Sequence, residues 1–214
     1  DLAVPAGQTV AVVGESGSGK SLTMLAVMGL LAEPLRVSGG AVRLGGRELT
    51  RLPERDLRAI RGNDMAMIYQ DPMTSLNPLM RVGDQVVEAM TAHGVAKPKA
   101  RARMLDLLAR VGIPDPVRTA KAYPHEFSGG MRQRIMIACA LAMRPRLLIA
   151  DEPTTALDVT IQQQILALVD ELRREFGMTT IWVTHDLGVV ARLVDRVVVM
   201  YAGTVVEDAP VRQI

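Results

Sequence analysis

Hydrophobic residues follow two patterns along this chain: short, mainly apolar runs, and longer stretches in which apolar residues recur with helical spacing. The short runs occupy residues 10–13, 65–69, 147–150, 179–184 and 196–201. Runs of this length are typical of strands buried on both faces of a parallel sheet. A shorter run at 41–44 is also β-like, and Gly45-Gly46 turns the chain after it.

Helical spacing fills most of the intervals between these runs. We predict helices over 20–31, 82–111 with a break at Lys97-Pro98, 130–142, 161–176 and 186–193, and a loop around Pro114 and Pro116. Strands that alternate with helices indicate an α/β fold with a mostly parallel sheet. The middle of the chain has no strong strand signal. We therefore predict an α/β core formed by 1–77 and 141–214, with a helical subdomain inserted at 78–140.

Composition narrows the possible functions. The 214 residues suffice for one sizeable domain, and with 3% aromatic residues its core must be mainly aliphatic. A net charge of +2 is too small to indicate general nucleic-acid binding. The single cysteine, Cys139, excludes an intrachain disulfide and fits a reducing compartment; we expect it to be a small core residue. The sequence has no stretch of 18 uncharged apolar residues, so we expect no transmembrane helix.

A glycine-rich loop follows the first strand and opens the first helix. Gly14, Glu15, Ser16, Gly17, Ser18, Gly19, Lys20 and Ser21 match the pattern G-x-x-x-x-G-K-[ST]. The glycines let successive N–H groups point inward, where they and the helix N-terminus can hold polyphosphate oxygens. Lys20 would contact the β- and γ-phosphates, and the Ser21 hydroxyl is a natural Mg²⁺ ligand. A glycine-rich turn without a ligand is the alternative, and the flanking strand and helix argue against it.

Two adjacent carboxylates, Asp151 and Glu152, end the apolar run at 147–150. Ligands bind at the carboxyl ends of the strands in open α/β sheets. Asp151 would hold Mg²⁺ through its water shell, and Glu152 would orient and deprotonate the attacking water. Alone, the pair could equally be two solvated acids at the end of a strand. Beside a phosphate loop, catalysis is the better interpretation.

The segment 127–134, Phe-Ser-Gly-Gly-Met-Arg-Gln-Arg, resembles the signature of ABC-type ATPases, which usually reads Leu-Ser-Gly-Gly-Gln. Ser128 is a good helix N-cap, while Gly129 and Gly130 permit close backbone approach. The helix that follows directs its positive end at an anion. The resemblance implies that this loop reaches across a dimer to the γ-phosphate of ATP bound by the partner. The two residues that depart from the usual signature, Phe127 and Met131, are both apolar.

Three further matches extend the resemblance over nearly the whole chain. Gln70 resembles the Q-loop glutamine, which touches Mg²⁺ and relays the nucleotide state to membrane subunits. Residues 156–158, Ala-Leu-Asp, resemble the D-loop, which adds Asp158 to the site. His185 resembles the switch histidine that contacts the γ-phosphate. By contrast, His93 and His125 match nothing catalytic, and we expect both to be ordinary surface or subdomain residues.

The resemblance implies a P-loop NTPase (RecA-like) core with a small antiparallel β portion and an ABC-type helical subdomain. It implies Lys20, Glu152 and His185 as catalytic residues, Ser21, Gln70 and Asp151 as metal ligands, and ATP and Mg²⁺ as cofactors. Segments 70–78, 127–134 and 150–160 resemble the oligopeptide, dipeptide and nickel importer branch. That branch implies an identical or paralogous ATPase partner, permease subunits, an indirectly linked solute-binding protein, and a place at the cytoplasmic face of the membrane.

One departure concerns adenine. The family usually has an aromatic residue upstream of the phosphate loop, where it stacks on adenine, but the first aromatic here is Tyr69. We therefore expect the N-terminal strand, the adenine platform and the C-terminal extension to lie outside this chain.

Three alternative functions remain. A non-transport ABC ATPase acting on nucleic acid or in translation usually carries coiled coils, zinc modules or tandem domains, which this sequence does not show. A regulatory nucleotide-binding module would not need Glu152 and His185. An unrelated P-loop kinase would lack Ser128-Gly129-Gly130.

Overall fold

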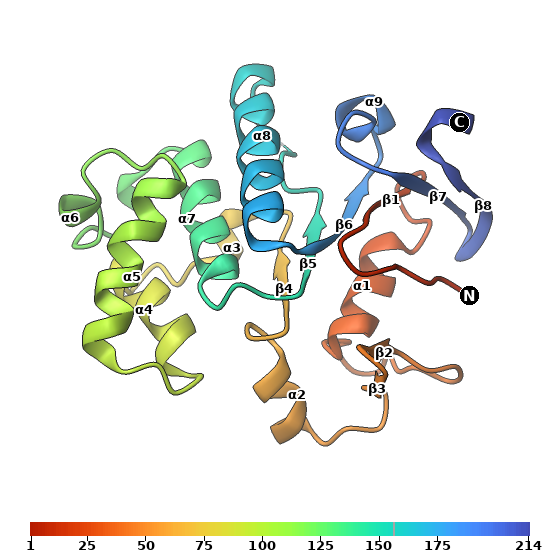
Figure 1. Cartoon of the computed structure of the whole chain (residues 1–214), viewed down its shortest axis with the longest axis horizontal. Coiled ribbons are helices and arrows are strands. Elements are labelled where there is room, and N and C mark those ends of the chain that lie inside the picture. Colours follow the sequence, from red (N-terminus) through yellow and green to blue (C-terminus); the bar gives the residue numbers. More distant parts are fainter. Residues whose placement is uncertain (156) are drawn as a thin grey trace.

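A six-stranded sheet forms the centre of the fold in the computed structural model, which describes residues 1–155 and 157–214. The strands lie in the order β4-β5-β6-β1-β7-β8. Their bounds are β1 Thr9–Val13, β4 Met65–Ile68, β5 Leu147–Asp151, β6 Thr179–Thr184, β7 Arg196–Tyr201 and β8 Thr204–Pro210. Neighbouring strands are parallel except β7 and β8, which are antiparallel (Figure 1). The carboxyl ends of the parallel strands therefore meet at one edge of the sheet.

The other elements are a small hairpin and a set of helices. They are α1 Lys20–Met28, β2 Arg43–Leu44, β3 Arg47–Glu48, α2 Glu54–Ile60, α3 Pro72–Ser75, α4 Val82–Thr91, α5 Lys97–Arg110, α6 Pro116–Thr119, η1 Pro124–Glu126, α7 Gly129–Leu141, α8 Val159–Phe176, α9 Leu187–Val190 and η2 Val211–Gln213. Strands β2 and β3 form a separate antiparallel pair. None of the helices in the described residues is long and apolar enough to cross a membrane.

Both faces of the sheet are covered. On β1, Val10 and Val12 pack in one cluster with Met24 of α1. Ala11 and Val13 point to the opposite face and belong to a second cluster, which includes apolar side chains of α8. Successive side chains of a strand point to opposite faces, so a strand covered on both sides is apolar at most positions. This explains why the strands appear in the sequence as apolar runs rather than as alternating patterns.

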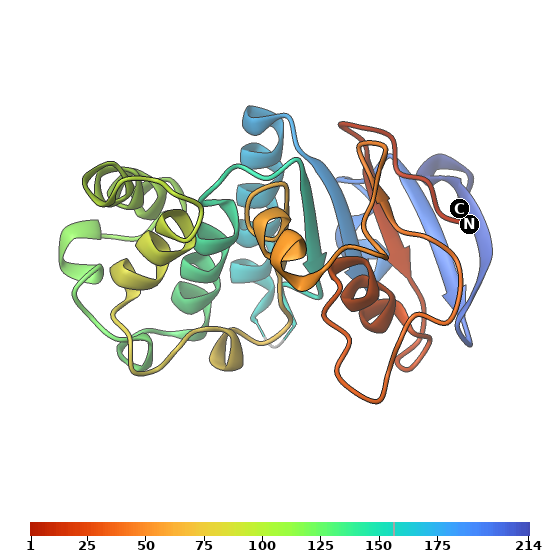
Figure 2. The same ribbon diagram turned by 90° about the horizontal axis from the view of Figure 1, so that it is seen from below.

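The helices from α4 to α7 gather at one end of the sheet, and β7 and β8 lie at the other (Figures 1 and 2). Helix α7 contacts strand β4 as well as α3, α4, α5 and α8. Its buried side chains include Ile135, Ile137 and Leu141. Because α7 reaches both the sheet and the outer helices, it joins the helical region to the sheet. The boundaries of the predicted subdomain at 78–140 stay a prediction.

Arg61 ties the end of α1 to α2. Its guanidinium donates to the backbone carbonyls of Met28 at 2.7 Å and Gly29 at 2.6 Å, and to the Glu54 carboxylate at 2.7 Å. The last carbonyls of a helix have no partner within the helix, so a guanidinium there both satisfies them and opposes the helix dipole. The contact holds the far end of the helix that begins at Lys20.

Several elements end elsewhere than predicted. Helix α1 stops at Met28 rather than residue 31, because Gly29 adopts a left-handed φ of 64° and caps the helix. The break expected at Lys97-Pro98 lies earlier, since Lys97 begins α5 and Pro98 occupies its first turn, where a missing N–H costs nothing. Pro116, predicted in a loop, begins the short helix α6, which the Asp115 carboxylate caps.

Two elements had no signal in the hydrophobic pattern. Strand β8 is exposed along most of its length, so it carries no buried run that would mark it as a strand. Helix α2 has a single buried residue, Ile60, and is otherwise charged or half-buried. Elements that bury few side chains leave little trace in a pattern that reports burial.

We predict that Leu148→Ala lowers the free energy of unfolding by about 2–5 kcal/mol, because Leu148 in β5 is 0% exposed and its loss leaves a cavity. Leu79→Ala is the matched control: that side chain is 86% exposed and should contribute less than about 0.5 kcal/mol. Urea unfolding of both variants measures the difference. Equal destabilisation by the two substitutions would contradict the assignment of β5 to the core.

Candidate active site

The loop from Gly14 to Gly19 connects β1 to α1 at the carboxyl edge of the sheet. Gly17 and Gly19 have φ values of 81° and 93°, a region that L side chains rarely adopt. At Gly14 a Cβ atom would lie 2.2 Å from the carbonyl oxygen of Met200. The loop therefore needs glycine at these positions for backbone conformation and for close packing against β7.

Lys20 is buried and folds back across this loop. Its Nζ donates to the carbonyl oxygens of Gly14 at 2.7 Å and Glu15 at 2.9 Å, and lies 3.4 Å from the Ser18 hydroxyl. All three acceptors are neutral, so they orient the ammonium group without neutralising its charge. The charge stays available to an anion placed over the loop.

Ser21 and Asp151 meet where α1 begins and β5 ends. The Ser21 hydroxyl donates to Oδ1 of Asp151 at 2.9 Å, and Asp151 is only 6% exposed. Burial raises the pKa of Asp151, and the nearby charge of Glu152 raises it further, against opposing effects of the Ser21 hydrogen bond and the Lys20 charge. A buried carboxylate beside a hydroxyl is a donor set that suits a hard divalent cation. In residues 1–155 and 157–214 no group of three or more His, Cys, Asp or Glu could hold a metal. A cation here would thus complete its shell with water and substrate oxygens.

The Glu152 carboxylate is the centre of a network between three loops. Gln70 Nε2, after β4, donates to Oε2 at 3.2 Å, and the Thr155 hydroxyl donates to the same oxygen at 2.9 Å. His185 Nδ1, after β6, lies 3.2 Å from Oε1. Glu152 itself has a left-handed φ of 45°, and its backbone N–H donates to Val183 at 2.9 Å. A strained non-glycine residue at the end of a strand is a common feature of active sites.

Residues of the phosphate loop and of the network around Glu152 line one cavity of about 710 Å³. It is lined by Ser16, Gly17, Gly19, Lys20, Ser21, Leu22, Gln70, Glu152, Thr155 and His185. The structure thus brings together the predicted phosphate loop, Gln70, Glu152 and His185. Sequence analysis did not single out Leu22 and Thr155; the spacing of Thr155, three residues after a catalytic acid, was an available signal. Within the described residues, Phe, Tyr and Trp are absent from the lining.

The signature residues lie away from this cavity, at the adjoining N-termini of α7 and α8. Ser128 caps α7 by accepting a bond from the Met131 N–H at 3.4 Å. Asp158 caps α8 by accepting one from the Ile161 N–H at 3.0 Å.

The packing between these two helices requires glycine at position 130, whereas a side chain at position 129 would make an ordinary contact. A Cβ on Gly130 would lie 2.9 Å from Ile161, and one on Gly129 would lie 3.7 Å from Leu157. Ala156, part of the predicted D-loop, is outside the described residues. Ser128, Gly129, Gly130 and Asp158 therefore form a second group of predicted site residues, which does not line the phosphate cavity of the same chain.

The profile of the family described as ABC transporter matches residues 1–155. This chain belongs to the ABC transporter family. The oligopeptide transport ATP-binding protein OppD of Salmonella typhimurium is 55% identical over 98% of this chain and 62% of its own length. OppD of Escherichia coli is 53% identical over 100% of this chain and 64% of its own length. These relatives confirm the resemblance to the oligopeptide importer branch, and the chain spans less than two thirds of their length.

Solved ABC cassettes share the fold. A dimeric bacterial ABC transporter cassette superposes with a TM-score of 0.86 at 30% identity, over 99% of this chain and 88% of its own. A dimeric ATP-binding cassette in a post-hydrolysis state bound to ADP and Pi gives 0.86 at 29% identity, with the same coverage. The predicted α/β fold class, with its mostly parallel sheet and small antiparallel portion, is confirmed.

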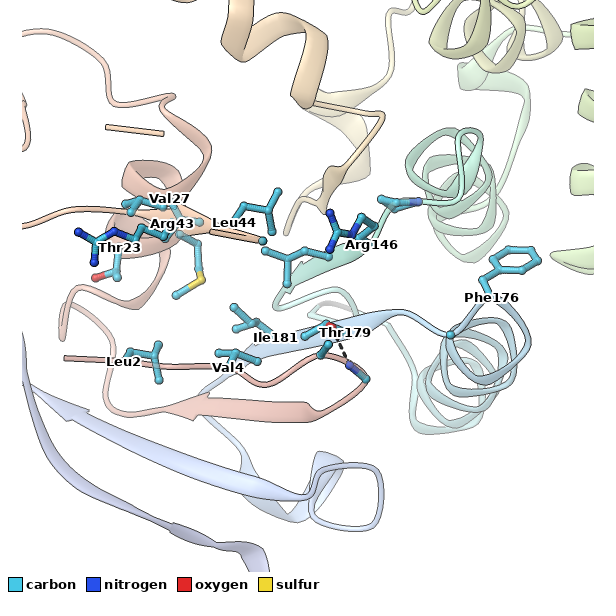
Figure 3. A pocket seen from close by; sticks show the side chains of 18 of the residues that line it. Leu2, Val4, Thr23, Val27, Arg43, Leu44, Arg146, Phe176, Thr179 and Ile181 are labelled. Carbon is cyan, nitrogen blue, oxygen red and sulfur yellow. Dashed lines mark hydrogen bonds between the residues drawn. The ribbon is translucent and has the colours of Figure 1, made fainter. Parts of the chain in front are cut away.

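This ABC transporter chain has a second cavity, of about 560 Å³, at the opposite edge of the sheet (Figure 3). Leu2, Val27 and Ile181 are among its apolar lining residues, and Arg43 and Arg146 also line it. It contains none of the predicted site residues. The residues predicted to bind phosphate and to activate water thus line the cavity at the carboxyl edge and do not line this one.

We predict that Asp151→Asn raises the melting temperature of the nucleotide-free protein at neutral pH. A carboxyl group whose folded pKa is raised binds its proton more tightly in the folded state, so its contribution to stability falls as pH rises through that range. The amide removes this penalty. The advantage of the variant should shrink as pH falls, because protonation removes the same charge from the wild-type protein.

Thermal unfolding across pH measures this effect. Repeating the measurement with added MgATP tests whether Asp151 contributes to metal binding. MgATP should raise the melting temperature of the wild type and have much less effect on Asp151→Asn, because the amide is a poorer metal ligand. A variant less stable than wild type at neutral pH, or stabilised equally by MgATP, would contradict the role of Asp151.

Proposed function

We propose that this chain binds MgATP in the 710 Å³ cavity and hydrolyses it as the motor subunit of a peptide importer. The convergence of Lys20, Ser21 and Glu152 on that one cavity, with the Asp151 carboxylate bonded to the Ser21 hydroxyl, carries the proposal. It supplies a cation for phosphate, oxygen ligands for a metal, and a carboxylate able to accept a proton.

The residues divide the chemistry between them. The loop N–H groups, the N-terminus of α1 and Lys20 would hold the phosphates, and Lys20 also opposes charge that develops in the transition state. Ser21, Asp151 and Gln70 would hold Mg²⁺, which would supply positive charge to oppose the negative charge of the phosphates.

Hydrolysis would proceed by in-line attack of water on the γ-phosphorus. Glu152 accepts the proton of that water, and the bond to ADP breaks with its electron pair leaving on the ADP oxygen. His185, 3.2 Å from the Glu152 carboxylate, would contact the transferred group. The network around Glu152 therefore places the proposed general base next to the histidine that would contact the phosphate.

The position of the signature residues supports a dimeric site. Ser128 and Gly129 are exposed and lie outside the cavity of their own chain. The Ser-capped N-terminus of α7 nevertheless suits an anion. We infer that it contacts the γ-phosphate bound by a second ATPase chain, identical or paralogous. Two similar solved cassettes are dimeric, which agrees with this arrangement.

A groove of about 620 Å³ between the sheet and the helical region suits the permease subunits. Leu30, Tyr69 and Met136 give it an apolar lining, and the very exposed Leu79 lies in the loop that contributes to it. That loop begins at Gln70, so a partner in the groove would act on the active site through it. The predicted subdomain 78–140 would move with this partner.

Cys139 also lines this groove, and its half-buried side chain packs against the apolar core as expected. Burial raises the pKa of its thiol to about 12, so the thiol is uncharged at neutral pH and acts as a packing group.

The names of the relatives direct the choice of cargo. They favour peptides over nickel. In this proposal a solute-binding protein delivers cargo to the permeases, and the ATPase acts at the cytoplasmic face of the membrane. None of these relatives favours the alternative of a nucleic-acid or translation ATPase.

Glu152→Gln tests the proposed hydrolysis. The amide keeps the size of the side chain but cannot accept a proton, so turnover should fall by about 10²–10⁴-fold while MgATP binding persists. Phosphate release and nucleotide affinity, measured on the same preparation, separate the two. Glu207→Gln, on exposed strand β8, is the matched control and should hydrolyse ATP like wild type. Near-normal turnover by Glu152→Gln would remove Glu152 from the role of base.

A mixing experiment tests the dimeric site. Ser128→Arg should bind nucleotide as a monomer but fail to hydrolyse it, whereas Lys20→Ala should lose both because Lys20 contacts phosphate in the ground and transition states alike. When the two are mixed, one site of each mixed dimer pairs an intact phosphate loop with an intact signature. Phosphate release should therefore recover in part. No recovery, with mixed dimers shown to form, would contradict the trans arrangement.

A further inference from the structure

Thr155 is bonded twice to Glu152 across a tight turn. Its backbone N–H donates to the Glu152 carbonyl at 3.1 Å, and its hydroxyl donates to Oε2 of the same residue at 2.9 Å. Pro153 occupies the second position of this four-residue turn, where its fixed φ favours the turn conformation. The turn thus holds the Thr155 hydroxyl against the carboxylate.

The Glu152 carboxylate needs such a constraint. The last torsion of a glutamate side chain is broad, so an unrestrained carboxylate rotates easily. The backbone of Glu152 is already fixed by its left-handed φ of 45° and by its bond to Val183. The remaining freedom is in the side chain, and hydrogen bonds to its oxygens remove that freedom.

The three groups bonded to the carboxylate differ in how they are held. Gln70 belongs to the loop that leads from β4 into the helical region, and His185 follows β6 with 59% of its side chain exposed. Both positions depend on loops that a bound nucleotide or partner would contact. Thr155 belongs to the same turn as Glu152, so its distance from the carboxylate does not depend on another loop.

We propose that Thr155 is a positioning residue for the general base Glu152. Its hydroxyl keeps its own proton and donates it to Oε2 throughout, which fixes the rotation of the carboxylate while the attacking water transfers its proton to Glu152. Thr155 contacts neither the phosphate nor the water. This inference rests on the proposed function of Glu152, and it assigns a role to a residue that follows the acid by three positions.

The pair Thr155→Val and Thr155→Ser tests the proposal on the full chain. Valine has nearly the same shape but no donor, whereas serine keeps the donor. With valine we expect kcat to fall about tenfold, or about 1.4 kcal/mol in activation free energy, with KM and MgATP affinity within about twofold of wild type. Serine should restore most of kcat. Thr204→Val, on exposed strand β8, is the control and should behave as wild type.

A second arm combines Thr155→Val with Glu152→Gln. If Thr155 acts only through the base, the double variant should hydrolyse ATP at the same residual rate as Glu152→Gln alone.

Three results would overturn the proposal by itself: wild-type kcat in Thr155→Val, a serine variant as impaired as valine, or a parallel loss of kcat and affinity. A further loss in the double variant would do the same. A wild-type chain that binds MgATP but releases no phosphate would instead overturn the proposed function, and the role of Thr155 with it.

Discussion

The parallel pairing of β1 with β6, and of β6 with β5, is the constraint on which the active site depends. Parallel strands end at the same edge, so the loop after β1, the acids after β5 and the histidine after β6 are brought together although they are far apart in the sequence. Strand β4 extends the same edge and adds Gln70. Reversing one of these strands would move its functional residue to the opposite edge, where the second cavity lies (Figure 3).

Hydrogen bonds within the protein already orient the charged groups at the carboxyl edge of the sheet. The Lys20 ammonium group is oriented by neutral carbonyl oxygens, which do not neutralise its charge. Asp151 is buried with a raised pKa, a state that a bound cation would relieve. The Lys20 charge acts on Asp151 but does not outweigh the effect of burial on the pKa of that carboxyl group. Binding of a metal with a polyphosphate would satisfy Lys20 and Asp151 at once, which favours the pair over either ligand alone.

The predicted site residues form two separate groups. The phosphate loop and Glu152 share one cavity, and Asp151 is bonded to Ser21 of that loop. Ser128 and Asp158 cap the neighbouring helices α7 and α8 outside the cavity. Close packing of Gly130 against Ile161 keeps the two caps adjacent. The segment after Glu152 leads directly into α8, so Glu152 and the N-terminus of α7 are joined through α8.

Sequence alone determined the elements and the chemistry that depend on neighbouring residues. The apolar runs identified β1, β5, β6 and β7 because both faces of the sheet are covered, and the glycine-rich loop was evident because its phosphate contacts come from consecutive residues. The caps of α7 and α8 were equally local. By contrast, exposed β8 and charged α2 left no apolar pattern and were missed.

Only the tertiary structure decided the strand order, the raised pKa of Asp151 and the network that joins Gln70, Thr155 and His185 to Glu152. Each of these depends on contacts between residues brought together by strand pairing or by a turn, and on burial by the whole fold. A local pattern can identify which side chains are able to do the chemistry. Their distances and their environment are set by how the strands pair.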